Sequence, residues 1–298
     1  MRVIKAPLRV SLFGGGTDIP EYFNNFGATI VSFAINRHIY LTHNPRPTGG
    51  YRVTYDKVEE LNSLAEAEHT LVQAAEERYD LGEPCTLSIV SDLPKGTGLG
   101  SSSSLAVALV TLALGELEPE ELAQEAYELE RQVSPVGVQD HLPAAFGGFH
   151  IYELNHRATE YEFAMDCGLL LYTGITRQAS AILEGMKHEI ATLHEIHALA
   201  EYVHVALPDL SMPELGELLT ETWLLKRRIP GVSTPELDWQ FTKAIEAGAR
   251  GGKLCGAGNG GCWFFIVSPD ERNRVKDALN LIEIPFCISP LGVEEIYL

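Results

Sequence analysis

The sequence has few basic residues for its length. Its 298 residues include 22 lysines and arginines against 41 aspartates and glutamates, which gives a formal net charge of −19. Such an excess of negative charge argues against a nucleic acid or an anionic membrane as the partner. An anionic ligand would need the few cations to be concentrated at its binding site, so the positions of lysine and arginine are informative.

The sequence also lacks paired cysteines and long apolar runs. None of its five cysteines forms a C-x-x-C pair, which is typical of reduced thiols in a cytoplasm. No apolar run approaches the roughly 18 residues that span a bilayer, and residues 1–10 show no signal-peptide pattern. We therefore expect a cytoplasmic protein that is not embedded in a membrane. A hydrophobic fraction of 45% and a charged fraction of 21% are typical of globular proteins.

What the sequence does contain is a glycine-rich loop between a predicted strand and a predicted helix. Residues 86–90 are typical of a strand, and residues 104–114 are apolar on nearly every side, which indicates a buried helix. The loop has glycine at every second position, at Gly96, Gly98 and Gly100. Serines follow at the expected helix N-terminus, where unbonded N–H groups and the helix dipole favour an anion. The loop therefore predicts a phosphate cradle, although a tight turn with serine caps has the same local pattern.

Two common nucleotide-binding signatures do not fit this loop. A P-loop ends in Gly-Lys-Ser/Thr, whereas Lys95 precedes the glycines here. A dinucleotide-binding fingerprint needs a third glycine at the position that Ser101 occupies. The loop is therefore of another kind.

Two further glycine-rich turns lie near the ends of the chain. Residues 3–13 are predicted to form a strand that contains Arg9 and runs into Gly14-Gly15-Gly16-Thr17-Asp18. Residues 251–261 form the other turn, between a helix predicted over 235–249 and a strand predicted over 262–267. Glycine-rich stretches interrupt a strand and must turn. Taken alone, each is also typical of an ordinary hairpin.

Two carboxylates lie between these turns. Glu130 lies beside the apolar stripe of an amphipathic helix predicted over residues 119–133, and Asp140 lies in the loop that follows. Taken alone, Glu130 is typical of a half-exposed helix residue and Asp140 of a turn former. Carboxylate and hydroxyl oxygens are also the ligands that Mg²⁺ prefers, and a second carboxylate can accept a proton from a substrate hydroxyl.

The remaining segments predict a mixture of strands and helices. Strands are expected over residues 28–42, 149–154, 160–165 and 169–174, and helices over 65–78, 176–204 and 215–228. The composition changes near Asp166.

The glycine loop, with the sequence Pro-Lys-Gly-Thr-Gly-Leu-Gly-Ser-Ser from Pro94, resembles the second motif of the galactokinase, homoserine kinase, mevalonate kinase and phosphomevalonate kinase (GHMP) superfamily. The other two turns match the first and third motifs in order and spacing. The resemblance implies an α+β fold of two domains, a ribosomal-protein-S5-like domain followed by a ferredoxin-like domain. The change in composition places their boundary so that the domains cover residues 1–166 and 167–298.

By this resemblance the protein is an ATP-dependent kinase that uses Mg²⁺. The residues implied to bind ATP and its phosphates are Lys95, Gly96, Thr97, Gly98, Leu99, Gly100, Ser101, Ser102 and Ser103. The implied Mg²⁺ ligands are Ser102, as the second serine after Gly-Leu-Gly, and Glu130. Asp140 is implied to take the proton from the attacking hydroxyl, and Arg9 to be the cation near the transferring phosphate. The implied substrate-binding residues are Gly15, Gly16, Thr17, Asp18, Gln139, Asp140, Thr173, Gly174, Arg177, Gly256 and Gly258.

The sequence around the motifs is similar to that of bacterial D-glycero-D-manno-heptose 7-phosphate kinases. This similarity implies transfer to the anomeric hydroxyl of a sugar that already bears a phosphate. Galactokinases have Glu-His at the positions of Gly15 and Gly16, and a carboxylate there would repel a phosphorylated sugar. The cations expected to hold the sugar phosphate are Arg177 and the basic run Lys226, Arg227 and Arg228.

Several alternatives stay open on the sequence. A fucokinase- or galactokinase-like enzyme would act on an unphosphorylated sugar, and a mevalonate-type kinase on another alcohol. A decarboxylase related to the diphosphomevalonate decarboxylases would share the fold, and a sensor would bind sugar and ATP without turnover. The presence of Arg9, Ser102, Glu130 and Asp140 argues against a sensor, because a binding protein needs no proton acceptor. In each case the partner is a small molecule, and a homodimer is compatible with the resemblance.

Overall fold

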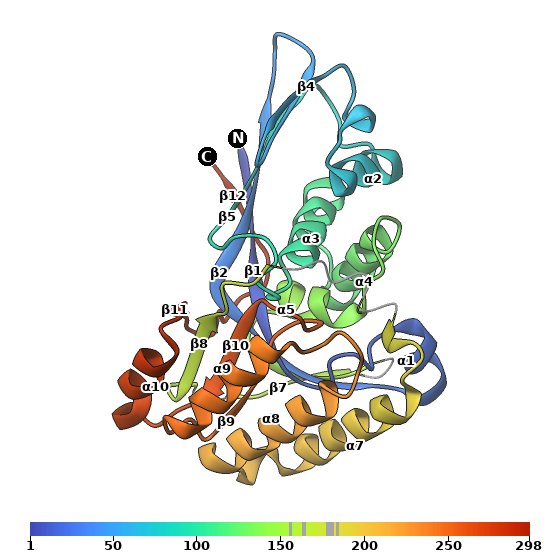
Figure 1. Ribbon diagram of the computed structural model, residues 1–298. Coiled ribbons are helices and arrows are strands. Elements are labelled where there is room, and N and C mark those ends of the chain that lie inside the picture. The colour runs from blue at the N-terminus through green and yellow to red at the C-terminus, as the bar shows by residue number, and fades with distance from the viewer. Residues whose placement is uncertain (155–156, 163–164, 177–181, 183–184) are drawn as a thin grey trace.

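The protein is built on two β-sheets that meet near the centre of the molecule (Figure 1). The structure is a computed structural model that describes residues 1–298 except 155–156, 163–164, 177–181 and 183–184. The first sheet has eight strands and the second has four. This arrangement is the two-domain α+β fold expected from the sequence.

The first sheet has the strand order β12-β1-β2-β5-β3-β4, with β6 beside β2 and β7 beside β6. The long strand β2 pairs with β1 on one edge, and with β6 and then β5 on the other. The strands are β1 (Arg2–Phe13), β2 (Thr29–Pro45), β3 (Tyr51–Thr54), β4 (Val58–Leu61), β5 (Cys85–Ser91), β6 (Phe149–Glu153), β7 (Arg157–Glu160) and β12 (Glu294–Tyr297). The strand predictions over 3–13, 28–42 and 86–90 are confirmed.

Four helices cover one face of the first sheet (Figure 1). They are α2 (Thr70–Tyr79), α3 (Ser101–Leu114), α4 (Pro119–Glu130) and α5 (His141–Phe146). The middle of α3 is buried all round, which agrees with its almost continuous apolar sequence. This helix packs on β1 and β2, and it therefore brings the glycine loop at its N-terminus to the central strands.

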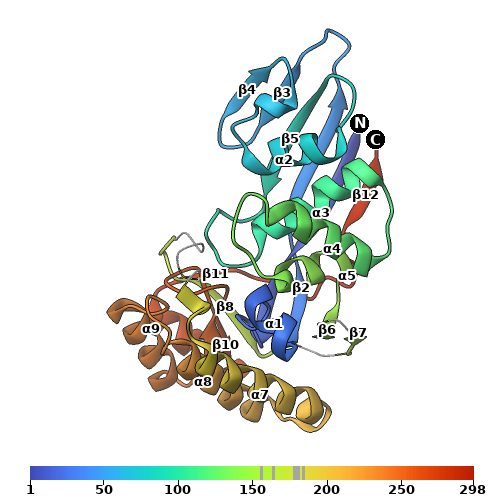
Figure 2. The same ribbon diagram turned by 90° about the vertical axis from the view of Figure 1, so that its right-hand side faces the viewer.

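The second sheet has the order β11-β8-β10-β9 and is antiparallel throughout its described pairings. Its strands are β8 (Gly168–Tyr172), β9 (Gly251–Leu254), β10 (Cys262–Ile266) and β11 (Ile282–Glu283). The helices associated with it are α7 (Ile190–Ala206), α8 (Met212–Lys226), α9 (Pro235–Glu246) and α10 (Arg272–Leu279). Figure 2 shows α1 (Pro20–Phe26) above α7, where the Tyr22 hydroxyl lies 2.8 Å from Nδ1 of His194.

The end of the chain returns to the first sheet. β12 pairs with β1 in antiparallel register, so the two termini lie side by side (Figure 1). The strands of the second sheet lie within residues 168–283, whereas the final strand belongs to the first sheet. The domain boundary at residue 166 stays a prediction. It assigns β12 to the second domain, although this strand pairs in the first sheet.

The structure corrects two of the predicted elements. The helix expected over 65–78 begins only at Thr70, because the Glu68 N–H donates to Glu59 (2.8 Å) and interrupts the helix after a short 3₁₀ turn at Leu64–Glu66. The strand expected over 160–165 is also displaced. β7 pairs with β6 with Glu153 opposite Arg157, so pairing occupies Arg157–Glu160. Residues 161, 162 and 165 belong to no strand, and 163–164 lie outside the described residues.

The helical region expected over 176–204 is described only in part. Within it, α7 begins at Ile190, and much of the preceding segment lies outside the described residues. None of the helices in the described ranges combines the length and the apolar content that crossing a membrane requires.

Candidate active site

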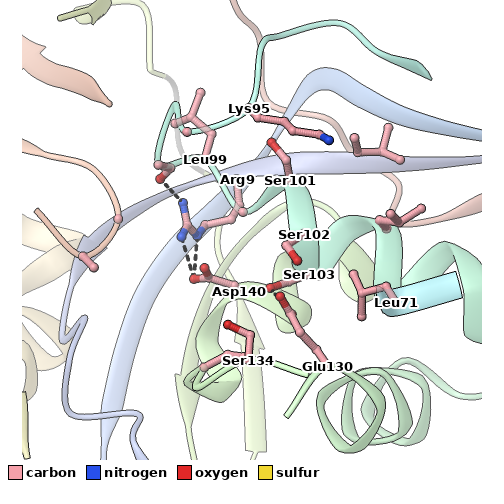
Figure 3. A pocket seen from close by; sticks show the side chains of 18 of the residues that line it. Arg9, Leu71, Lys95, Leu99, Ser101, Ser102, Ser103, Glu130, Ser134 and Asp140 are labelled. Carbon is pink, nitrogen blue, oxygen red and sulfur yellow. Dashed lines mark hydrogen bonds and ion pairs between the residues drawn. The ribbon is translucent and has the colours of Figure 1, made fainter. Parts of the chain in front are cut away.

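A cavity of about 690 Å³ lies where the glycine loop, the start of α5 and the third glycine-rich turn come together. Of the predicted site residues, it is lined by Arg9, Gly16, Asp18, Lys95, Gly96, Gly98, Leu99, Gly100, Ser101, Ser102, Ser103, Glu130, Gln139, Asp140 and Gly256. Figure 3 shows Arg9, the serines, Glu130 and Asp140 around one side of this space. Folding therefore gathers all three motifs at one cavity.

Both the backbone and the side chain of Arg9 in β1 hold the glycine loop. The Arg9 N–H donates to the Leu99 carbonyl (3.0 Å), and the Arg9 guanidinium donates to the Gly98 carbonyl (2.7 Å). Gly100 precedes α3 in a left-handed conformation with φ 79°, and a Cβ there would lie 3.2 Å from Cγ of Arg9. Helix α3 starts at Ser101, three residues earlier than predicted, so the serines form its first turn. Their N–H groups belong to the helix end that favours an anion.

Asp140 and Arg9 form an ion pair at the cavity wall. Nε and an Nη of Arg9 lie 2.9 and 2.6 Å from the same Asp140 oxygen, Oδ1. The Arg9 side chain is 1% exposed, whereas that of Asp140 is 27% exposed and faces the cavity (Figure 3). The guanidinium thus holds one oxygen of a carboxylate whose other oxygen can meet a substrate hydroxyl.

Asp18 is a buried carboxylate with three protein donors. The Gly16 N–H (2.9 Å) and the Gln139 side-chain amide (3.1 Å) donate to Oδ1, and the Gln139 N–H (3.2 Å) donates to Oδ2. Burial raises the pKa of Asp18, and the nearby charge of Asp140 raises it further, against the effect of these hydrogen bonds. A Cβ at Gly137 would lie 1.7 Å from Oδ2 of Asp18, so the chain needs glycine there to bring Asp18 to the cavity. Its role in binding the substrate stays a prediction.

Glu130 is the second buried carboxylate of the site. The Ser103 hydroxyl donates to its Oε2 (2.7 Å), and Nε2 of the fully buried His141 lies 2.7 Å from the same oxygen. Burial raises the pKa of Glu130, but its contacts with His141, Ser102 and Ser103 outweigh this effect, so the pKa is lowered and the charged form is favoured. Sequence reasoning missed His141, because a histidine beside Asp140 has no local feature that indicates its partner.

The donor atoms around Glu130 fit a magnesium ion. A carboxylate held in its charged form and the exposed hydroxyl of Ser102 both border the cavity (Figure 3). Hard oxygen donors of this kind suit Mg²⁺, which keeps several waters and phosphate oxygens as its other ligands. Ser103 is buried and donates to Glu130, whereas Ser102 is exposed, lines the cavity and also contacts Glu130.

The far end of the cavity is more apolar. Lys95 lies at the rim, where it pairs with Asp56 (2.6 Å) and lies 5.3 Å from the centre of the Tyr55 ring. Apolar side chains from α2, β5 and α3 also contribute to the wall, among them Leu71, Ile89 and Leu105. A wall of this kind suits the flat ring of a nucleotide base. The sequence did not indicate it, because its residues come from elements with no motif.

The third glycine-rich turn closes the cavity from the second sheet. A Cβ at Gly261 would lie 2.6 Å from the carbonyl oxygen of Thr97, so this turn packs directly on the glycine loop. Thr173 donates to the Gly261 carbonyl through its N–H (2.9 Å) and its hydroxyl (2.8 Å). The buried Lys226 donates to the Gly256 carbonyl, and both residues line the cavity.

Other predicted site residues support these contacts from behind the cavity wall. Thr17 donates to the Gly14 carbonyl (2.8 Å), and Gly258 packs on Val232. Within the described ranges, the residues that do not border the cavity are Gly15, Thr17, Thr97, Thr173, Gly174 and Gly258. Arg177 lies outside the described residues.

The basic run at the end of α8 does not act as one cluster. Arg227 pairs with Asp238 (3.1 Å) and Arg228 with Glu195 (2.9 Å), and neither borders the cavity. The expectation that all three cations face the substrate is therefore wrong, because a helix end points successive side chains in different directions. Only Lys226 of the three reaches the cavity.

Comparison with known proteins is consistent with this geometry. The GHMP kinases N terminal domain matches residues 64–148, and the GHMP kinases C terminal domain matches residues 203–281. The chain is 31% identical to the D-glycero-alpha-D-manno-heptose 7-phosphate kinase of Campylobacter jejuni, over 93% of this chain and 92% of that protein. It is 28% identical to the mevalonate kinase of Thermococcus sibiricus, over 94% and 93% of the two chains. A crystal structure of a D-glycero-D-manno-heptose 1-phosphate kinase from Bacteroides thetaiotaomicron superposes with a TM-score of 0.78 at 25% identity, covering 100% of this chain and 99% of the other.

Proposed function

The chain belongs to the GHMP kinases, ATP-dependent enzymes that phosphorylate hydroxyl groups, and we propose that its acceptor is the anomeric hydroxyl of D-glycero-D-manno-heptose 7-phosphate. The observation that carries this choice of sugar is the end-to-end similarity to the Campylobacter heptose 7-phosphate kinase. The residues expected to face the sugar, which we call the acceptor side of the cavity, support this choice.

The residues of the cavity divide between the two substrates. The glycine loop and the first turn of α3 would hold the phosphates of ATP, and Ser102 and Glu130 would hold Mg²⁺. The metal, when bound, neutralises charge on the phosphates and orients them. The acceptor oxygen attacks the γ-phosphorus, the bond from that phosphorus to the bridging oxygen of ADP breaks, and the hydroxyl proton passes to Asp140. Arg9 holds Asp140 in place and supplies positive charge beside the transferring group.

The acceptor side favours a sugar that carries a negative charge. Gly15 carries no carboxylate where galactokinases have one, and a Cβ there would lie 3.0 Å from Oε1 of Gln139 and 3.2 Å from Oγ of Ser11, so that these side chains would have to shift. Such a carboxylate about 4 Å from a phosphate would cost about 1 to 4 kcal/mol. Lys226 instead places an ammonium group at the cavity. We propose that it contacts the 7-phosphate, together with Arg177.

Mevalonate kinases are similar to this chain over a comparable length, so mevalonate is the main competing acceptor. L-fucose and galactose follow, as acceptors of a kinase for unphosphorylated sugars. An assay of ADP release with Mg-ATP would compare these compounds with heptose 7-phosphate and with the free heptose. We expect kcat/KM for heptose 7-phosphate to exceed that for the free heptose at least about tenfold, the value of one charge-assisted contact.

A pair of variants separates the phosphate contact from a general effect of lost charge. Lys226→Met should raise KM for heptose 7-phosphate about tenfold and leave KM for the free heptose nearly unchanged. Arg228→Met removes a cation from the same helix end, where it pairs with Glu195 away from the cavity, and should change neither value. Equal or better activity on mevalonate, fucose or galactose would overturn the proposed acceptor.

A further inference from the structure

A buried lysine lies between the two sheets, beside the cavity but outside its lining. Lys253 belongs to β9 in the second sheet and is 1% exposed. Its Nζ donates to the carbonyl oxygen of Ser11 in β1 of the first sheet (2.8 Å). Its cross-strand partner in β10 is Phe264, whose ring packs edge-on against Phe33 of β2. The surroundings are therefore largely apolar, and a cation there needs a compensating partner.

The carbonyl that accepts this hydrogen bond belongs to β1, the strand that also contains Arg9. Ser11 follows Arg9 by two residues in β1, and residues two apart in a strand point to the same face. Arg9 pairs with Asp140, while the Ser11 hydroxyl donates to Oε1 of Gln139 (2.9 Å). The side-chain amide of Gln139 in turn donates to Asp18. Lys253 thus contacts the segment of β1 whose residues Arg9 and Ser11 hold Asp140 directly and Asp18 through Gln139.

The charges around Lys253 come from three elements. They are Arg9 of β1, Asp140 before α5, and the Cys255 thiol just beyond β9. Burial, with a further contribution from the charge of Arg9, lowers the pKa of Lys253 to about 8, whereas Cys255 and Asp140 oppose this effect. The ammonium is therefore mostly charged at neutral pH, and it lies close enough to the Arg9–Asp140 pair to interact with both side chains.

We propose that Lys253 is a positioning residue for phosphoryl transfer, whose ammonium group holds β1 at Ser11 and through this strand keeps the Asp140 and Asp18 carboxylates in place. It acts through these groups and does not touch either substrate. This role rests on the kinase activity of the family and not on the identity of the sugar. The tests therefore use whichever of heptose 7-phosphate, mevalonate, L-fucose or galactose the wild-type enzyme phosphorylates, so a wrong choice of sugar leaves them valid.

The first test compares substitutions at Lys253. Lys253→Met should lower kcat about a hundredfold, because small displacements of the reacting groups have effects of this size. KM for ATP should change less than about threefold, since the nucleotide contacts are elsewhere. Lys253→Arg keeps the charge and should recover most of the activity. Lys243→Met, which removes an exposed cation paired with Glu246 on α9, is the matched control and should match the wild type.

The second test is the pH dependence of the wild-type enzyme, which needs no variant to fold. We expect kcat to fall as the pH rises through about 8, where Lys253 loses its proton. The free energy of unfolding should instead rise with pH over the same range. The unfolded chain keeps this proton up to about pH 10.4, so between the two values the unfolded state binds more protons and the contribution of Lys253 to the free energy of unfolding rises with pH. If kcat falls over this range while the protein stays folded, the fall reflects the effect of Lys253 on the active site and not a loss of stability.

Variants sharpen this measurement. Lys253→Arg should remove the alkaline fall in kcat, because a guanidinium stays charged. A flat wild-type profile between pH 7.5 and 9.5, or an alkaline fall that persists in a folded Lys253→Arg enzyme, would overturn the proposal. So would a folded Lys253→Met enzyme with wild-type kcat.

Discussion

Among single residues, the charged side chains of the site differ in how many of their contacts come from the protein itself. Asp18 and Glu130 are buried and have several protein partners, and Asp140 is bound through one oxygen and open at the other. A carboxylate that is held but not fully occupied can accept a proton without rearrangement. This is the reason that Asp140, and not Asp18 or Glu130, is the proposed base.

Replacing Asp140 tests this assignment. Asp140→Asn keeps the shape but cannot accept the proton, and kcat should fall by about two to four powers of ten. The loose transition state of phosphoryl transfer needs little help from a base, so the loss should lie toward the lower end. KM for ATP should stay nearly constant in steady-state assays. Asp238→Asn, at a surface ion pair with Arg227, is the control; turnover by Asp140→Asn at the wild-type rate would remove Asp140 from the mechanism.

At the scale of an element, the first turn of α3 gives four consecutive serines different surroundings. Ser102 is exposed at the cavity, whereas Ser103 is buried and donates to Glu130. Ser104 donates to the Pro7 carbonyl of β1 (2.7 Å). The helical repeat turns each successive side chain by about 100°, so one turn distributes the serines among solvent, carboxylate and strand.

This distribution predicts which serine affects the metal. Ser102→Ala should raise the free Mg²⁺ concentration needed for half-maximal activity by about tenfold or more, on the scale of losses seen at metal sites. Ser101→Ala, at the preceding position, should have little effect. Initial rates measured against free Mg²⁺ at saturating ATP would separate the two. The opposite order of effects would mean that Ser101 is the ligand.

At the scale of the whole molecule, the site depends on contact between the two sheets. Gly261 packs on Thr97 of the glycine loop, and Lys253 of the second sheet donates to Ser11 of the first. The return of β12 to β1 further ties the end of the chain to the strand that carries Arg9. A change at the contact between the sheets should therefore alter both stability and ATP binding.

Gly261→Ala tests this dependence. Its φ of +102° and the close Thr97 carbonyl both oppose a side chain, so we expect a lower melting temperature and a kcat/KM for ATP reduced about tenfold. Gly82→Ala has a similar φ, +91°, with no atom within 4 Å among the described residues, and it reports the backbone strain alone. It should lower the melting temperature by a few degrees, on the scale of about 2–4 °C per kcal/mol, and leave KM for ATP unchanged. If the two substitutions changed kcat/KM for ATP equally, the contact between Gly261 and the glycine loop would not contribute to ATP binding.

Much of the fold and part of the site could be predicted from local sequence. The strand that carries Arg9, the glycine loop before α3, and the helix that ends at Glu130 each have a periodicity or a spacing of glycines that is a property of neighbouring residues. The start of α2 and the position of β7 were missed, because contacts of Glu68 and the register of a hairpin decide them.

The sequence by itself therefore determined the family, the order of the elements and the candidate residues of the three motifs. Only the tertiary structure decided that His141 meets Glu130, that Lys253 meets Ser11, and that Lys226 faces the cavity while Arg227 and Arg228 do not. Backbone propensity and side-chain periodicity act over a few residues, whereas Lys253 and Ser11 are separated by 242 positions. Contacts of that kind depend on how the two sheets pack, which no local pattern specifies.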